Sequence, residues 1–325
     1  MSGDGQAILF GQDLKFQPGE FYTLQSATFV PEPPAWATVV GQAYRLTASS
    51  NAPDFGGTLL SITYQGDEVP PGEEGWLKMF YYDGSAWQPL TTTLNVAFNY
   101  ASAPTQRKGL YALMSSLEIP LYGPGWDAFG YPVQGTRPVT DALRSIKGYY
   151  ATVYRYDAGK AFYNRWDMYD VGVPGWVNDL HELEFGESYL ISLTQAITLY
   201  LKGASDTTLA GANSLLNPPS TYYGQVIAGP SLVPSVGMTV TAWINDNLCG
   251  QDRTSKVDDQ VVYSINVFAD GLGDSAGCGT PERSVRFEVG SQVMTPIARW
   301  DNNQVREVVL SSGFRIYLPM VLKRQ

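Results

Sequence analysis

The chain has 325 residues, of which 16% are charged, and its 31 acidic and 21 basic side chains give a formal net charge of −10. This charge would repel a phosphate backbone, so we expect no nucleic-acid partner. The 33 glycines, 21 prolines and 21 tyrosines suit short strands joined by tight turns and argue against a helical bundle. We therefore predict a mainly β protein of tandem β-sandwich-like domains, without a membrane span.

Residues 1–118 are predicted to form the first module, a β-sandwich-like domain of short β-favouring runs and Gly- and Pro-rich connectors. Its clearest feature is a hairpin, in which Asp83-Gly84 tolerates a positive φ and Trp87 lies on the return strand. Together with the run at residues 109–114, this stretch resembles β-sandwich modules that sit beside ZU5-like domains in secreted and surface proteins of bacteria. The resemblance implies a scaffold or linker role without catalysis.

Residues 119–202 are predicted to form a central β-rich module with one short helix. An alternating strand opens at Trp126, and apolar residues spaced by four and three then predict a helix at residues 139–146. Thr136 is a candidate N-cap for this helix. The remaining strands of the module are predicted at residues 149–157, 186–193 and 196–201.

The order of motifs in residues 123–201 resembles a recurrent module of secreted bacterial and archaeal proteins. The shared motifs are an initial Gly-Trp, a helix ending in Ser-Ile, a strand ending in Tyr-Asp, then Trp-x-x-Tyr and Asn-Asp-Leu-x-x-Leu. The chain departs from this outline at Asp127 and Ala128, which replace Asn-Leu, at Glu187, which replaces Gly, and at Leu190, which replaces Trp. The last change removes an aromatic side chain, and the resemblance implies no catalytic activity.

A polar stretch at residues 203–219, ending in Pro-Pro, is predicted to be a linker, and residues 220–312 are predicted to form the third module. This module holds both cysteines, Cys249 and Cys278, each followed by Gly. Two cysteines in one β-rich module predict a disulfide, and therefore an exported protein. Two buried free thiols in a cytosolic protein are the alternative.

The third module is similar to transthyretin-like or carboxypeptidase-regulatory-like sandwiches of exported proteins, through Ala-Trp-Ile-Asn-Asp-Asn-Leu-Cys-Gly and Gly-Cys-Gly-Thr-Pro. That resemblance implies that the cysteines tie a turn to a neighbouring loop. The tail, residues 313–325, resembles the Tyr-Leu-Pro endings of secreted proteins from Chloroflexota-type bacteria; a final edge strand is the alternative. We expect an extracellular or cell-surface location. Because residues 1–5 lack signal-peptide features, the signal segment would then be missing from this sequence, unless the protein is an intact cytosolic one.

The chain offers few groups for catalysis or metal binding. Its one histidine, His181, lacks the partners that a zinc site or a His-dependent nucleophile needs. Residues 270–274 could bind Ca²⁺, although a plain turn is the preferred interpretation, and no other metal or cofactor is expected. A carboxylate-dependent glycosidase is a weaker alternative, for which the candidate acids are Glu73, Glu74, Glu182, Glu184, Asp258 and Asp259.

Aromatic side chains of the central module are the main candidates for a ligand-binding surface, because exposed rings bind sugars and peptides through apolar contact. The alternative is that they fill a β-sheet core. The candidates are Trp126, Tyr131, Trp166, Trp176 and Tyr189.

These features predict a non-catalytic extracellular protein with a structural or adhesive role in a bacterial surface or secreted assembly. Its expected partners are other surface or matrix proteins, and polysaccharide is a further candidate. The alternative is a carbohydrate-binding accessory region of a secreted enzyme. A row of exposed, coplanar aromatic rings would favour that alternative, whereas burial of the three tryptophans would count against it.

Overall fold

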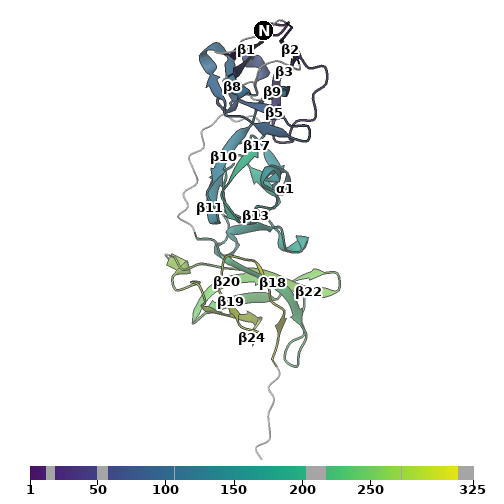
Figure 1. Ribbon diagram of the computed structural model, residues 1–325. Helices are drawn as coiled ribbons and strands as arrows, with labels where there is room; N and C mark the ends of the chain where they lie inside the picture. The colour runs from purple at the N-terminus through teal and green to yellow at the C-terminus, as the bar shows by residue number, and fades with distance from the viewer. Residues whose placement is uncertain (12–18, 50–57, 106, 203–216, 272, 314–325) are drawn as a thin grey trace, which may run out of the picture.

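The computed structural model describes residues 1–11, 19–49, 58–105, 107–202, 217–271 and 273–313. The chain is mainly β, as predicted, and three β-rich modules follow one another along the molecule (Figure 1). Most of the predicted linker and nearly all of the predicted tail lie outside the described residues.

The first module is a sandwich of two antiparallel sheets (Figure 1). In spatial order, one sheet contains β1 (Ala7–Gly11), β4 (Thr58–Thr63), β8 (Tyr100–Thr105) and β7 (Thr93–Asn95). The other contains β2 (Tyr22–Ser26), β3 (Thr38–Ala48), β9 (Gly109–Ser115), β5 (Lys78–Tyr82) and β6 (Trp87–Pro89). Short 3₁₀ turns lie at Gly66–Glu68, Glu74–Trp76 and Val96–Phe98.

The predicted hairpin at Asp83-Gly84 is confirmed, and it joins β5 to β6. Gly84 has a φ of +104°, and one carboxylate oxygen of Asp83 accepts the backbone N–H groups of Ser85 and Ala86, both over 2.8 Å. A side-chain oxygen thus replaces the missing backbone acceptor at the turn. These hydrogen bonds hold the pKa of Asp83 well below its usual range.

Strand β9 lies in the middle of its sheet and is apolar on both faces. Tyr111 and Leu113 point into the core between the two sheets, whereas Leu110 and Ala112 pack on the outer face, which Trp36 helps to cover. The alternation follows the two-residue period of a strand. The outer face is therefore part of a second core, and not a solvent surface.

The central module has a four-stranded antiparallel sheet, two strand pairs and the single α-helix of the described residues. The sheet contains β11 (Gly125–Gly130), β16 (Ser188–Leu193), β13 (Tyr150–Tyr156) and β14 (Trp166–Asp170) in spatial order. The pairs are β10 (Leu117–Leu121) with β17 (Ile197–Leu201), and β12 (Thr136–Pro138) with β15 (Glu182–Glu184). Helix α1 spans Val139–Ala142, and 3₁₀ turns lie at Arg144–Ile146, Phe162–Asn164 and Gly175–Val177.

Three predictions for this module need correction. Thr136 does not cap α1, because it lies in β12, and the first helical N–H, that of Val139, is instead satisfied by the backbone oxygen of His181 at 3.0 Å. The helical segment is also split into α1 and a 3₁₀ turn. In addition, β10 crosses the boundary predicted after residue 118 and pairs along its whole length with β17, so it belongs with the central module.

The third module is a second sandwich. One sheet contains β21 (Ser255–Val257), β22 (Gln260–Val267), β18 (Ser220–Ile227) and β26 (Arg306–Glu307), with β27 (Leu310–Ser311) also paired to β18. The other contains β20 (Asn247–Arg253), β19 (Thr239–Ile244), β23 (Ser284–Val289) and β24 (Gln292–Val293), with β25 (Ala298–Arg299) also paired to β23. A 3₁₀ turn lies at Gly273–Ser275. Strands β26 and β27 run parallel to β18, whereas the other pairs are antiparallel.

The predicted disulfide between Cys249 and Cys278 is confirmed, and it joins β20 to the loop before β23. The next residue, Gly279, lies directly against the ring of Trp300, so that any Cβ at this position would overlap the indole. Trp300 is buried and donates its indole N–H to the backbone oxygen of Val267 over 2.9 Å. The Gly-Cys-Gly sequence therefore serves close packing at the end of the sandwich.

Removal of the disulfide should destabilise the third module. For the Cys249→Ser/Cys278→Ser double variant we expect a loss of about 3–4 kcal/mol in the free energy of unfolding, because the bond closes a loop with a sequence separation of 29. Guanidinium denaturation with and without a reductant measures this loss. The reductant should destabilise the wild type and leave the variant unchanged; an unchanged wild-type midpoint would contradict the prediction.

Candidate functional site

The predicted aromatic residues do not form an exposed row. Tyr131 and Tyr189 are 0% and 1% exposed and belong to the central module's own core. Trp166 is 5% exposed, and Trp126 and Trp176 are half-buried; all three lie in a hydrophobic cluster shared with the third module. The structure therefore gives these side chains packing roles. Trp166 is buried, and Trp126 and Trp176 pack against the shared cluster, which counts against a ligand platform built from them.

Both faces of the central sheet are buried. Along β16, Tyr189 and Ile191 point into the central module's core, whereas Leu190 joins the cluster shared with the third module. Along β13, Val153 and Tyr154 divide between the two sides in the same way. One face of the sheet is thus covered by its own module and the other by the module that follows (Figure 1).

Aromatic pairs connect the two modules across this interface. The ring of Trp176 packs edge-on against Tyr223 of β18, with centroids 5.8 Å apart. Phe162, in the turn before β14, packs against Phe268 at 4.7 Å, and Tyr163 stacks on the same ring at 6.1 Å. Such contacts between rings add to the stabilisation that the buried area already provides.

A chain of hydrogen bonds crosses the same interface. Thr221 uses its single hydroxyl proton to donate to the side-chain oxygen of Asn266 over 2.5 Å, so Tyr154 must be the donor in its 2.6 Å bond to Thr221. The amide of Asn266 in turn donates to the backbone oxygen of Trp166 over 3.0 Å. Burial raises the pKa of Tyr154, which keeps its hydroxyl protonated as this chain requires.

An ion-pair network lies beside the interface. Arg155 binds Asp167 over 2.8 Å and Glu184 over 2.5 Å, and Lys160 pairs with the other oxygen of Asp167. The side chain of Asp167 is only 6% exposed, so these two cations neutralise a buried charge. Asp167 is therefore committed to structure and is not available to a substrate.

A polar groove of about 520 Å³ opens between the central and third modules. Asp179 contributes a carboxylate from the central module, and Asp252 contributes one from the third. Both side chains reach solvent, but protein surrounds them on the walls of the groove. This partial desolvation raises the pKa of Asp179 to about 6, despite the hydrogen bond that it accepts from the N–H of Met168, and it raises the pKa of Asp252 as well.

The acids of this groove are not those that the sequence suggested. Glu73 is buried and accepts the hydroxyl of Ser115 over 2.5 Å, and Glu74 accepts that of Tyr64 over 2.9 Å. Glu184 is paired with Arg155. The remaining candidates, Glu182, Asp258 and Asp259, are exposed side chains outside the groove.

The remaining candidates from the sequence, His181 and the possible Ca²⁺ segment, lie on the surface or in a turn. His181 is exposed. In the candidate Ca²⁺ segment, Asp270 accepts the backbone N–H of Gly277 over 2.7 Å, and Leu272 lies outside the described residues. Within the described ranges, no group of three or more His, Cys, Asp or Glu side chains is arranged to hold a metal ion.

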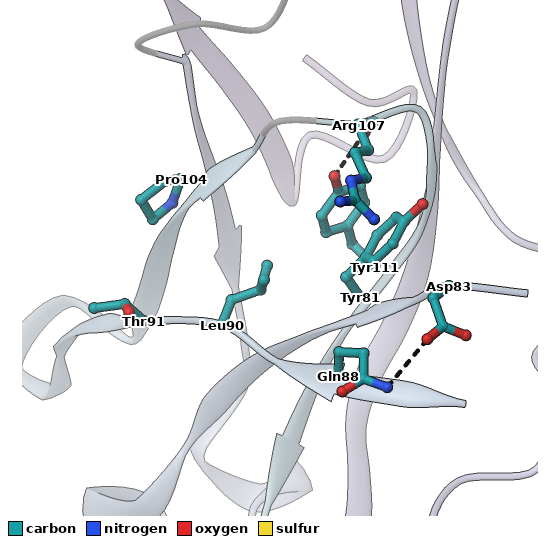
Figure 2. Close-up of a pocket in the computed structure, with 8 residues that line it drawn as sticks. All are labelled: Tyr81, Asp83, Gln88, Leu90, Thr91, Pro104, Arg107 and Tyr111. Carbon is teal, nitrogen blue, oxygen red and sulfur yellow. Dashed lines mark hydrogen bonds between the residues drawn. The ribbon is translucent and has the colours of Figure 1, made fainter. Parts of the chain in front are cut away.

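A second cavity, of about 370 Å³, lies in the first module between the β5–β6 hairpin and the start of β9 (Figure 2). Tyr81 and Tyr111 form one side of it. Tyr111 donates its hydroxyl to the backbone oxygen of Arg107 over 2.6 Å, Tyr81 donates to that of Lys108, and Asp83 accepts from Gln88. Burial raises the pKa of Tyr111 to about 12. Most polar groups of this cavity therefore serve to hold the loop and the turn in place.

A third cavity, of about 230 Å³, lies where the first module meets the central one, and it is lined by side chains from both. Trp36 of the first module stacks on Tyr200 of β17, with centroids 4.6 Å apart and planes at 24°. Nearby, Lys78 of β5 binds Glu118 of β10 over 2.6 Å. Neither this cavity nor the groove carries a sequence motif, because their residues come from distant segments of the chain.

Comparisons with known proteins add no assignment. No protein-family model matches the chain, and no curated protein matches it significantly. In the described part of the chain, no helix is both long enough and apolar enough to cross a membrane.

The Tyr154→Phe variant should be less stable by about 1–1.5 kcal/mol, because it removes the first donor of the buried hydrogen-bond chain and leaves Thr221 short of a partner. Equilibrium denaturation measures the difference. Tyr169→Phe is the matched control, since Tyr169 is a half-buried tyrosine that packs on the opposite side of the same sheet. An equal loss of stability in both variants would show that the buried hydrogen bonds from Tyr154 contribute no more to stability than an ordinary tyrosine hydroxyl does.

The Asp179→Asn variant should be stabilised near pH 8 and almost unchanged near pH 4. Folding raises the pKa of this carboxyl from 3.8 to about 6, which means that the folded state favours the protonated form. The stability that protonation contributes is therefore fully present below about pH 4 and is lost as the pH rises through about 6. Because the side chain reaches water, we expect only about 1 kcal/mol, or roughly 2–4 °C in Tm.

Thermal denaturation between about pH 4 and 8 measures the effect of Asp179→Asn. Asparagine keeps the oxygen that accepts the Met168 N–H, so the substitution changes mainly the charge. Asp259→Asn is the control, because the side chain of Asp259 is fully exposed, at 104%. A gain that does not depend on pH would contradict the assigned cause.

Proposed function

We propose that this chain is a non-catalytic extracellular protein with a structural or adhesive role in a bacterial surface or secreted assembly, and that its partners are surface or matrix proteins. The observation that carries the proposal is the interface between the central and third modules. There, the aromatic side chains that could have formed a ligand platform pack against the next module instead.

This interface supports a structural role because it fixes the orientation of two modules. Contacts between domains of one chain usually permit relative motion unless they are extensive and apolar. Here the two modules share a hydrophobic cluster, and the bonds from Tyr154 to Thr221 and from Asn266 to Trp166 require one register between the sheets. A pair of modules joined in this way can hold binding surfaces at a fixed separation, as a scaffold or an adhesin requires.

The disulfide supports the extracellular part of the proposal. Disulfides persist in oxidising compartments and are rare in reducing ones, and Cys249 and Cys278 join two parts of one sandwich. The alternative, a carbohydrate-binding accessory region built on the central aromatics, lacks such support, because Trp166, Tyr131 and Tyr189 are buried.

A parallel binding and turnover experiment tests the proposal. The full chain is immobilised and exposed to a panel of extracellular matrix proteins and polysaccharides, while the same substances are incubated with the protein and examined by mass spectrometry for cleavage products. We expect saturable binding to at least one matrix protein and no products.

One result would show that the protein is a hydrolase and would overturn the proposal. Asp179 and Asp252 face one groove and both have raised pKa values, so they are the pair on which catalysis by carboxylates would rest. Products that disappear in Asp179→Asn or Asp252→Asn, but persist in Asp259→Asn, would overturn the non-catalytic assignment.

A further inference from the structure

The cavity between the first and central modules concentrates positive charge in an acidic protein. Arg137, Arg144 and Lys202 line it, and Asp141 is the only acid among its lining residues. The whole chain carries a net charge of −10. Three cations against one anion at a junction between modules is therefore a local reversal of the protein's charge, and it favours an anionic ligand.

The pocket is held in place by contacts that do not use up its cationic groups. Arg137 donates one N–H to the backbone oxygen of Lys202 over 2.7 Å, which positions the guanidinium and leaves its other donors. Arg144 and Asp141 form a 2.8 Å pair, with side chains 57% and 49% exposed, so a ligand can compete with it. Ser145 braces the strand of the pocket wall through two 3.0 Å bonds with the backbone of Tyr200.

An apolar wall lies beside these cations. Trp36 and Tyr200 both line the cavity and are stacked on each other. Guanidinium groups bind carboxylate and sulfate through paired N–H donors, and aromatic side chains provide the apolar contact that a sugar ring makes. The volume of about 230 Å³ is below the roughly 300–1,000 Å³ of drug-sized sites, which suits a single sugar residue better than a larger ligand.

We propose that this pocket binds an acidic sugar residue, that is, a saccharide unit that carries a carboxylate or sulfate group. Arg137 and Arg144 bind the anionic group, and Trp36 and Tyr200 contact the ring. A nucleic acid is disfavoured, because the net charge of −10 repels its phosphate backbone beyond the pocket. The inference specifies a partner for the proposed interaction role and places it away from the buried aromatics of the central sheet.

Calorimetric titration of the full chain tests this site. The probes are a hyaluronan tetrasaccharide, which carries carboxylates, a chondroitin sulfate tetrasaccharide, neutral cellotetraose, sodium sulfate and a hexaglutamate peptide. We expect an acidic tetrasaccharide to bind about tenfold more tightly than cellotetraose, since at least one charge-assisted contact is lost with the neutral sugar. Affinity should fall as salt is added.

Variants with opposite predicted effects make the test specific. Arg144→Gln should weaken binding of the acidic sugar about tenfold, whereas Asp141→Asn should strengthen it several-fold, because it frees the Arg144 guanidinium. The matched controls are Arg299→Gln and Glu282→Gln, which alter a similarly exposed pair in the third module and should change nothing. Arg144 is exposed, so loss of folding does not obscure the result, and thermal denaturation verifies this.

The remaining outcomes each overturn the assignment. Equal binding of cellotetraose would remove the anionic requirement. Sulfate that binds as tightly as the saccharides would identify an inorganic oxyanion site, and tighter binding of hexaglutamate would identify an acidic protein as the partner. An acidic sugar whose affinity is unchanged in Arg144→Gln and Asp141→Asn would bind elsewhere. If none of the probes binds, the proposed pocket is wrong, but the proposed structural or adhesive role still stands provided that the protein binds a matrix protein. Cleavage products in the turnover experiment would refute that role itself.

Discussion

Burial of the central sheet on both faces is the constraint on which the rest of the structure depends. A sheet with an apolar stripe on each side cannot face solvent, so it needs two covering layers. One is supplied by α1 and the β10–β17 pair, and the other by the third module. Because the second layer belongs to the next part of the chain, the central and third modules cannot pack independently without exposing Trp166 and Tyr154.

The hydrogen-bond chain within this interface determines orientation more than it determines affinity. Apolar contact alone tolerates sliding, whereas a buried polar group without its partner costs free energy. Tyr154, Thr221 and Asn266 are satisfied only in one register of the two sheets. The groove beside them lies where the two modules meet, and its walls partly desolvate Asp179, which explains the raised pKa of that carboxyl.

The fold class, several strands and the disulfide could be predicted from the sequence, because alternating apolar residues, turn residues and two cysteines in one module can be recognised without knowledge of the tertiary structure. The environments of the aromatic side chains could not be predicted. The sequence around Trp176 does not indicate whether its ring faces solvent or packs against Tyr223. Strand β10 escaped prediction because its partner, β17, lies about eighty residues away. The pocket at Arg137 and Arg144 and the groove acids escaped for a similar reason, since only the assembled modules bring their residues together.

The two junctions between modules differ in their contacts, and this difference suits one of them to a rigid connection and the other to ligand binding. The junction between the central and third modules is broad, aromatic and hydrogen-bonded. The junction between the first and central modules is joined by the Trp36–Tyr200 stack and the Lys78–Glu118 pair, and it carries an open cavity lined from both sides. A ligand in that cavity would touch both modules and would favour the arrangement that it binds. In that case the junction between the central and third modules would maintain the shape of the protein, and the ligand would act at the junction between the first and central modules.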